Sequence, residues 1–278
     1  MSGQDEGGGQ WWSGVRKSMC SSFFKSGRNY MEKRIFDKKS HIIDGRRAFV
    51  YQFGVASMAC LLAQFAPINP ALADSGKLPK PENVINPDKA MERLLSGNER
   101  YVNGVARRHD FSRERDALVG SQNPYAAILG CADSRVSPEY AFDSGRGDLF
   151  VVRVAGNYVN DGVIGSLEYS VYKLGVPLLL VLGHDRCGAI GAAIKVEEGR
   201  EKYPNKIQGI SETLVPAVKA ARALPGDLMS NSVKCNVLNS VARLKAESKI
   251  ISNAVAAGRL SVVGAVYRLS SGRVEIVG

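Results

Sequence analysis

Apolar and polar residues follow two different periods along most of the chain beyond residue 87. Five short apolar runs are bounded by glycine, proline or polar residues, which is typical of strands. The run LLLVL is almost purely aliphatic, as expected for a strand covered on both faces of its sheet. The predicted strands are Tyr125–Leu129, Leu149–Val154, Leu178–Leu182, Leu260–Leu269 and Val274–Val277, the last two joined by a turn at Ser270-Ser271-Gly272.

Between these runs, apolar residues recur every three to four positions, which is the period of an amphipathic helix. Met91, Leu94 and Leu95 keep this spacing in the first such segment. Strands that alternate with helices predict an α/β fold with a mostly parallel β-sheet, flanking helices and right-handed crossovers. The predicted helices are Lys89–Asn103, Glu114–Gly120, a helix starting at Ser137-Pro138-Glu139, Leu167–Leu174, Gly188–Glu198, Ser211–Leu224 and Asn236–Ala257.

The first 86 residues have a different pattern. Arg46-Arg47 stands directly before residues 48–73, which carry no charge and end in Ala71-Leu72-Ala73. A basic n-region, an apolar h-region and a small-residue cleavage site are typical of an export signal, and paired arginines favour the twin-arginine type. We therefore predict a targeting leader at 1–73 with cleavage after Ala73, a linker at 74–86 and one folded domain at 87–278.

The leader predicts export to the far side of a membrane, either the periplasm or the thylakoid lumen. Two other interpretations stay open. Without cleavage, the charge-free stretch is long enough to anchor the protein facing that compartment, and the leader would then be the only membrane contact. The first 45 residues are rich in Ser, Lys, Arg and Gly, which also suits an organellar transit segment and a location in the stroma.

Half of the net charge of +10 belongs to the leader, because residues 1–47 carry 10 Lys+Arg and 5 Asp+Glu. The rest of the chain has no stripe of interleaved basic and aromatic side chains, so we expect no nucleic-acid partner. The cysteines are too widely spaced to indicate a disulfide framework, which favours metal binding or burial instead. They are Cys20, Cys60, Cys131, Cys187 and Cys235.

Three potential metal ligands follow predicted strands. Cys131 comes directly after YAAILG, and His184 and Cys187 follow LLLVLG in the same way. Taken singly, such residues are commonly a buried hydrophobe or a hydrogen-bonded cap. Together they would meet where the carboxyl ends of parallel strands gather ligands. Two thiolates and one imidazole with a fourth position open are typical of a catalytic zinc site.

Asp133 and Arg135 follow Cys131 with alternating spacing, so on an extended segment both side chains point to one side. An arginine bound to a carboxylate through two hydrogen bonds keeps that carboxylate ionised and orients it. Near zinc, the carboxylate would either accept a hydrogen bond from a zinc-bound hydroxide or occupy the open position itself. A purely structural ion pair is the third interpretation.

These residues lie within sequence blocks that resemble those of β-class carbonic anhydrases. The blocks are CADSRVSPEYAFDSGRGDLFVVRVAGNYV, GSLEYSVYKLGV and VLGHDRCGAI, and the resemblance runs from Pro87 to the VVGAVYRLSSGRVEIVG ending. The resemblance implies the β-carbonic anhydrase fold. It also implies one Zn²⁺ per subunit held by Cys131, His184 and Cys187, with Asp133 and Arg135 as the catalytic dyad.

The resemblance further implies a narrow substrate pocket, usually completed across the interface of a homodimer or higher homo-oligomer. In it, Gln122 hydrogen-bonds the bound anion, Phe150 and Tyr169 form apolar walls, and Gly188 presents a backbone N–H. Ile128 stands where the allosteric subgroup has tryptophan, so the chain is more similar to the Gln-containing, non-allosteric subgroup. Ala155 replaces a valine of a related branch, which leaves substrate access open.

The implied activity is the zinc-dependent, reversible hydration of carbon dioxide to bicarbonate and a proton, carried out by a zinc-bound hydroxide. Two alternatives remain at this point. Carbon disulfide and carbonyl sulfide are linear molecules like carbon dioxide, so hydrolysis of either could use the same scaffold and metal chemistry. A catalytically silent zinc-binding scaffold is the other, although a scaffold has no need of an open zinc position or of the Asp133–Arg135 pair.

Overall fold

The computed structural model describes residues 85–277, so the predicted leader and most of the predicted linker lie outside the described residues. Within this range, five strands form one sheet in the order β2-β1-β3-β4-β5. The β2-β1, β1-β3 and β3-β4 pairs are parallel, and β5 pairs with β4 in the antiparallel direction. The strands are β1 (Ala126–Gly130), β2 (Leu149–Arg153), β3 (Leu178–His184), β4 (Ser261–Tyr267) and β5 (Val274–Val277).

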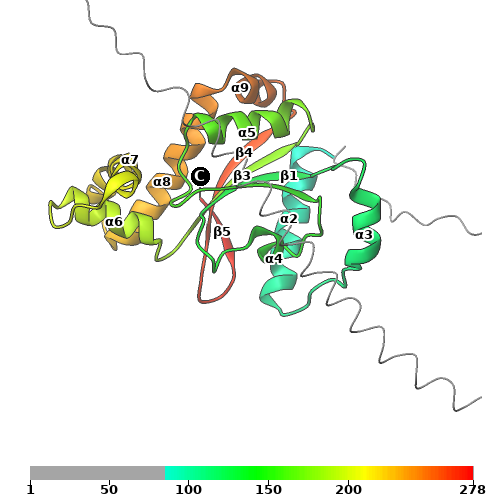
Figure 1. The fold of residues 1–278 in the computed structure, drawn as a ribbon, viewed down its shortest axis with the longest axis horizontal. Helices are drawn as coiled ribbons and strands as arrows, with labels where there is room; N and C mark the ends of the chain where they lie inside the picture. Colours follow the sequence, from blue (N-terminus) through cyan, green and yellow to red (C-terminus); the bar gives the residue numbers. More distant parts are fainter. Residues whose placement is uncertain (1–84, 278) are drawn as a thin grey trace, which may run out of the picture. The chain divides into compact units, whose positions relative to one another are not determined.

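Helices cover both faces of this sheet (Figure 1). On one face lie α2 (Pro87–Val102) and the short α4 (Pro138–Ala141); on the other lie α5 (Asp161–Tyr172), α8 (Leu228–Glu247) and α9 (Lys249–Ala256). Alternate strand residues serve the two faces: Leu179 and Val181 pack with the second group, and Leu178 and Leu180 with the first. Both faces are therefore buried, as the aliphatic run at 178–182 predicts.

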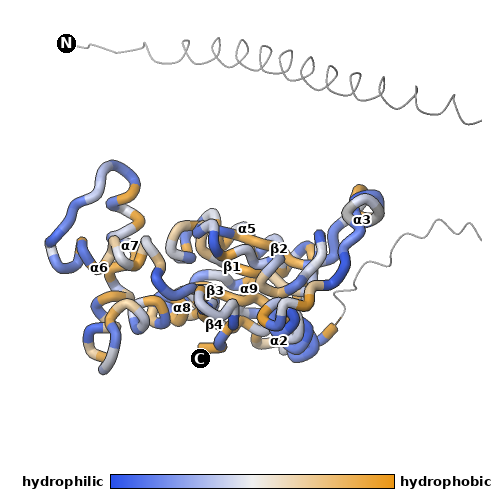
Figure 2. Tube along the Cα trace, turned by 90° about the horizontal axis from the view of Figure 1, so that it is seen from below, coloured by the Kyte–Doolittle hydropathy of each residue, from blue (hydrophilic) through white to orange (hydrophobic). Residues whose placement is uncertain are grey.

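The remaining helices lie at the sides of this layered core. The helices α6 (Gly188–Glu197) and α7 (Asn205–Arg222) pack on each other, and α7 also packs on α8. The connection between α6 and α7 is a hydrophilic loop at the left of Figure 2. On the opposite side, α3 (Phe111–Leu118) lies outside α2 and leads into β1.

Two glycines let α8 pack directly on the sheet. A Cβ at Gly183 of β3 would lie 2.6 Å from Val237 Cγ2, and one at Gly264 of β4 would lie 2.6 Å from Val237 Cγ1. Because real Cβ atoms do not approach other carbons this closely, only glycine fits at these points. The close contact fixes α8 against the strand that carries His184.

All five predicted strands are confirmed, with ends that differ by one or two residues; the fourth is shorter at both ends than predicted. The helix predicted at 236–257 is wrong as a single element. It divides at Ser248, whose backbone is extended and whose hydroxyl accepts a hydrogen bond from Ile251 N–H, so Ser248 ends α8 and caps α9. The helices predicted at 167–174 and 211–224 begin earlier than predicted: α5 starts after the capping residue Asn160, and α7 starts after Pro204.

The structure contains no helix in residues 85–277 that is both long enough and apolar enough to cross a membrane.

Candidate active site

Cys131 lies directly after β1 and is buried, with 5% of its surface exposed. Its position is fixed through its backbone, because Arg153 Nε at the end of β2 donates to the Cys131 carbonyl oxygen at 2.8 Å. The thiol group also has a backbone partner. Gly156 N–H donates to Cys131 Sγ at 3.3 Å, in a buried environment.

His184 is the last residue of β3 and is fully buried, and Cys187 follows three residues later at the start of α6. Between them, Arg186 adopts a left-handed backbone conformation with φ 52°, which turns the chain sharply from strand to helix. Asp185 fixes this turn, because its side chain accepts a hydrogen bond from Leu269 N–H at 2.9 Å. Cys187 therefore stands at a helix N-terminus, where the partial positive charge of the helix favours a thiolate.

The three side chains converge as the sequence predicts. The sulfur atoms of Cys131 and Cys187 and a ring nitrogen of His184 all lie within 4.8 Å of one another. Separations of this size fit one ion, since zinc binds thiolate sulfur at about 2.3 Å and imidazole nitrogen at about 2.0 Å. Because β1 and β3 are neighbours in the sheet, residues more than 50 positions apart in sequence share one site.

The imidazole of His184 is prepared for a metal. Its Nδ1 lies 2.9 Å from the Asp185 carbonyl oxygen, which can only accept, so the proton is on Nδ1. Its Nε2 is buried and has no hydrogen-bond partner among the described residues. A buried polar atom of this kind is rare and calls for an explanation, and a metal ligand supplies one. The donor set, the tautomer and the bare Nε2 all fit zinc.

Without a metal, the pKa values of the two thiols shift in opposite directions. A hydrogen bond from Cys187, stronger in effect than the opposing burial, lowers the pKa of Cys131 to about 4, and His184 and Gly156 N–H act in the same direction. The same contact and burial raise the pKa of Cys187. A bound dication would favour the thiolate form of both cysteines, since cysteine binds metals as thiolate.

Asp133 lies beside this cluster, with Oδ2 at 3.9 Å from His184 Nε2. Arg135 binds both carboxylate oxygens: its Nε donates to Oδ1 at 2.9 Å and its Nη2 donates to Oδ2 at 2.7 Å. This hydrogen-bonded guanidinium holds the pKa of Asp133 well below its usual range. Asp133 is therefore a fixed, permanently ionised acceptor next to the potential metal ligands.

The sequence analysis does not identify Arg153 and Asp185, although both position the backbone segments that carry the potential metal ligands. Besides the Cys131 carbonyl, Arg153 binds the Asp133 carbonyl oxygen, with Nη2 at 2.5 Å, and so fixes the segment that carries both residues. A single charge at the end of an otherwise aliphatic strand, LFVVR, is a signal that could have singled out Arg153. Asp185 has no comparable signal, because its role depends on a contact 84 positions away in sequence.

Of the four predicted pocket residues, Gly188 directly follows the potential ligand Cys187, and the other three come from separate segments. Gln122 lies in the exposed segment between α3 and β1, and Gly188 is exposed at the first position of α6. Phe150 of β2 and Tyr169 of α5 form an aromatic pair with ring centroids 6.3 Å apart. Tyr169 is half-exposed. The substrate-binding roles of these four residues stay predictions.

The fold and the site define a class of protein: an α/β protein with a buried Cys₂His cluster that could hold a metal ion, beside an aspartate bound by arginine. Comparison with known proteins agrees. A carbonic anhydrase family profile matches residues 126–274. The chain is 41% identical over 189 residues to carbonic anhydrase 2 of Mycobacterium tuberculosis, which is 68% of this chain and 91% of that protein.

Solved structures support the same family. The β-carbonic anhydrase CcaA matches with a TM-score of 0.53 and 31% identity, over 67% of this chain and 94% of that one. A Coccomyxa β-carbonic anhydrase, solved in complex with acetazolamide, matches with a TM-score of 0.52 and 31% identity, over 67% of this chain and 86% of that one. The chain belongs to the carbonic anhydrase family and has the fold of its β class.

Proposed function

We propose that this chain interconverts carbon dioxide and bicarbonate with a zinc ion held by Cys131, His184 and Cys187. The observation that carries this proposal is the buried convergence of the three side chains, with an unpartnered His184 Nε2, beside a carboxylate that Arg135 keeps ionised. Family membership supplies the reaction. Purified protein containing zinc should accelerate carbon dioxide hydration in a stopped-flow assay, and chelator-treated protein should not.

When bound, zinc supplies Lewis acidity: in a carbonic anhydrase with three histidine ligands, the pKa of coordinated water falls from 15.7 to about 7. Two thiolates neutralise more of the charge than imidazoles do, so we expect a less acidic water here. Asp133 offsets part of this loss. With zinc bound, the Asp133 carboxylate would accept a hydrogen bond from the nucleophile and so orient it toward carbon dioxide.

We propose that the chain belongs to the non-allosteric subgroup, because it has Gln122 and because Ile128 stands where the allosteric subgroup has tryptophan. Ile128 is fully buried in the core between β1 and the helices on the α2 face. Both oxygens of the Asp133 carboxylate are bound by Arg135, which supports a resting state in which this carboxylate is not a metal ligand. Gln122 would then steady the developing bicarbonate by a hydrogen bond.

We propose that the working unit is a homodimer or a larger homo-oligomer in which one subunit's Phe150 and Tyr169 complete the pocket of the other. The exposed position of Tyr169 supports this arrangement. A Sordaria macrospora relative with the same fold, at 23% identity, is described as tetrameric. Co-expressing Cys187→Ala with Tyr169→Ala subunits tests it: mixed dimers should regain activity that neither variant has alone, and absence of any gain would refute a shared pocket.

The leader remains a proposal, and it rests on the sequence alone. We propose cleavage after Ala73 by a twin-arginine-type export route, with the mature enzyme in the periplasm or thylakoid lumen. Intact-mass analysis of the native protein should find a chain that starts at Asp74. A native protein that retains residues 1–73 would contradict cleavage, and its fractionation with membranes would favour the anchor.

A further inference from the structure

One face of α8 carries three hydrogen-bond donors that point at the same loop. Asn236, Ser240 and Arg243 follow at the spacing that places residues on one side of a helix. Asn236 Nδ2 donates to Gly156 O at 2.7 Å, Ser240 Oγ to Asn157 O at 3.2 Å, and Arg243 Nη1 to Val159 O at 2.8 Å. Three carbonyl groups of the 156–159 loop are thus held by a single helix.

The loop needs this support because its backbone is unusual. Gly156 and Asn157 both have positive φ angles, 86° and 40°, in the left-handed region that costs free energy for residues other than glycine. The loop is also tightly enclosed: a Cβ at Gly156 would lie 2.7 Å from Leu214 Cδ1 of α7 and 3.2 Å from Ala189 Cβ of α6. Its conformation is therefore determined by α6, α7 and α8 together.

Gly156 connects this loop to the candidate metal site. The peptide group on its N-terminal side donates its N–H to Cys131 Sγ at 3.3 Å, and the peptide group on its C-terminal side offers its C=O to Asn236. Both contacts are buried, and Asn236 itself is 5% exposed. Since the two peptide groups share one Cα, fixing the carbonyl of Gly156 restricts the direction of its N–H.

We propose that Asn236 is a positioning residue for the metal site, acting through Gly156 to keep an N–H···S hydrogen bond on Cys131. This inference rests on the proposed role of Cys131 as a zinc ligand. The hydrogen bond withdraws electron density from the thiolate, so Cys131 donates less charge to the metal than a bare thiolate would. It thereby offsets part of the charge neutralisation that two thiolates impose.

Asn98 provides a matched control. It is also a buried asparagine, 5% exposed, and its Nδ2 also donates to backbone carbonyl oxygens, those of Ala141 and Gly272, at 2.8 Å each. None of these contacts is to Cys131, His184, Cys187 or the 156–159 loop. Asn98→Ala and Asn236→Ala each remove a buried asparagine amide that binds backbone carbonyls, and Asn236→Leu removes the donor while it fills the space.

Two measurements separate positioning from general stability. Zinc affinity by chelator competition should fall about 10- to 100-fold in Asn236→Ala and Asn236→Leu, because the loss of a fixed Cys131 geometry outweighs the stronger donation of a thiolate without its hydrogen bond. It should stay unchanged in Asn98→Ala. In protein loaded with cobalt, the thiolate-to-cobalt charge-transfer absorption should move to longer wavelength in the Asn236 variants only, because a thiolate without its hydrogen bond is a better electron donor. Unchanged zinc affinity and an unchanged cobalt spectrum in folded Asn236 variants would overturn the proposal.

A measurement on the unaltered protein keeps the proposal testable if the variants do not fold. With cadmium-113 in the site, the amide proton of Gly156 should show a coupling to the metal through the N–H···S hydrogen bond, and its absence would overturn the inference. Failure of the underlying site assignment looks different. In that case the unaltered protein would bind no cadmium and would show no thiolate-to-cobalt absorption at all.

Discussion

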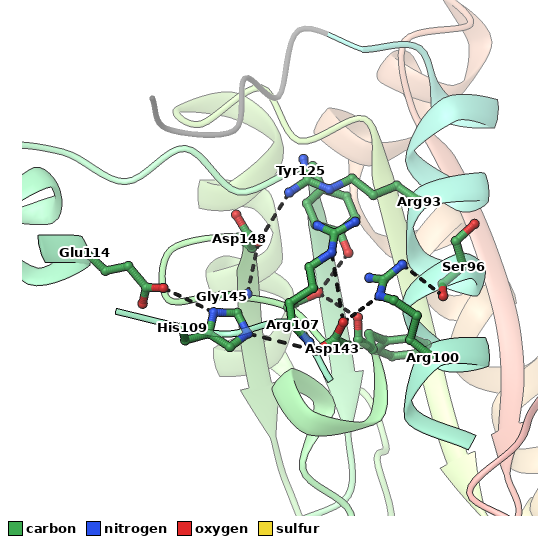
Figure 3. A network of polar contacts seen from close by, with 12 residues as sticks. Arg93, Ser96, Arg100, Arg107, His109, Glu114, Tyr125, Asp143, Gly145 and Asp148 are labelled. Atoms are coloured by element: carbon green, nitrogen blue, oxygen red, sulfur yellow. Dashed lines mark hydrogen bonds and ion pairs between the residues drawn. The ribbon is translucent and has the colours of Figure 1, made fainter. Parts of the chain in front are cut away.

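The two ends of strand β1 carry buried polar groups of contrasting kinds. At its amino end, charged side chains surround Asp143 and Asp148 (Figure 3). Asp143 accepts hydrogen bonds from Arg100 Nε at 2.6 Å and from Arg107 N–H at 2.9 Å, and Asp148 accepts from Arg93 at 3.2 Å. At its carboxyl end, Cys131 and Cys187 meet His184, whose buried Nε2 has no hydrogen-bond partner in the described part of the chain.

The difference separates a structural cluster from a functional one. Around Asp143 and Asp148, opposite charges neutralise each other within the protein, and the backbone N–H of Gly145 adds a further bond to Asp148. Around Cys131, two thiol groups and a ring nitrogen without a hydrogen-bond partner in residues 85–277 lie within 4.8 Å of one another, and no cationic side chain is among them, so a metal cation fits the site. A missing partner alone does not mark function, because Glu114 Oε2 in the network at the amino end also lacks one among the described residues. At His184 Nε2 it is informative because two thiol groups converge on the same point.

The largest expected effect comes from removing a ligand of the incomplete site. Cys187→Ala should abolish zinc binding and carbon dioxide hydration together, because two ligands with an intact fold do not hold the ion tightly. Elemental analysis and a stopped-flow assay on one preparation check this. A Cys187→Ala protein with one zinc per subunit would contradict the assignment.

Breaking the Asp133–Arg135 ion pair next to the cluster should have a smaller effect on zinc binding and activity. Arg135→Ala should retain zinc but frees Asp133 to turn toward the metal, so hydration should fall by about 100-fold or more. Arg100→Ala is the matched control, because it breaks an arginine–aspartate pair at the other end of β1. It should lower stability while the rate per folded, zinc-loaded subunit stays near that of the unaltered protein. Equal losses of activity in both variants would mean that the Asp133–Arg135 pair is only structural.

The smallest effect on activity is expected from a change in the charged cluster around Asp143 and Asp148. Asp143→Asn should leave hydration unchanged and lower the free energy of unfolding by about 1–3 kcal/mol, because a charged hydrogen-bond acceptor is lost in a buried place. Denaturant unfolding with Asp116→Asn, an exposed site on α3, as the control checks the size of the loss. A lower zinc content in Asp143→Asn would show that the cluster at the amino end of β1 also affects metal binding, which contradicts a purely structural role.

The same variant makes a pH prediction. Burial disfavours ionisation of Asp143, but hydrogen bonds from Arg100 and from Arg107 N–H outweigh it and lower the pKa of the carboxyl group. A lowered folded-state pKa contributes stability that is complete above the unfolded pKa of about 3.9 and is lost as pH falls through the folded value. The stability difference between the unaltered protein and Asp143→Asn should therefore stay constant from neutral pH to about pH 5 and shrink as the pH falls below about 4. A difference that grows on acidification would contradict this sign.

Much of the site is predictable because its residues follow strand ends. Cys131 and His184 come directly after aliphatic runs, Cys187 follows His184 by three residues, and neighbouring parallel strands bring their ends together. The supporting contacts are not predictable in this way. Asn236 meets Gly156 from 80 positions away, and Asp185 meets Leu269 from 84 positions away, so both depend on how helices and hairpins pack. The break at Ser248 was missed for a related reason, since a serine inside an amphipathic pattern becomes a cap only when the second helix turns onto α5.

The most direct test of the account is a zinc titration of the zinc-free 74–278 protein with metal content and stopped-flow carbon dioxide hydration measured on each sample. We predict that activity rises in proportion to bound zinc and stops rising at one equivalent per subunit. Full zinc occupancy without hydration would show a silent scaffold, and hydration that does not depend on zinc would contradict the central claim that the Cys131, His184 and Cys187 cluster is the catalytic centre.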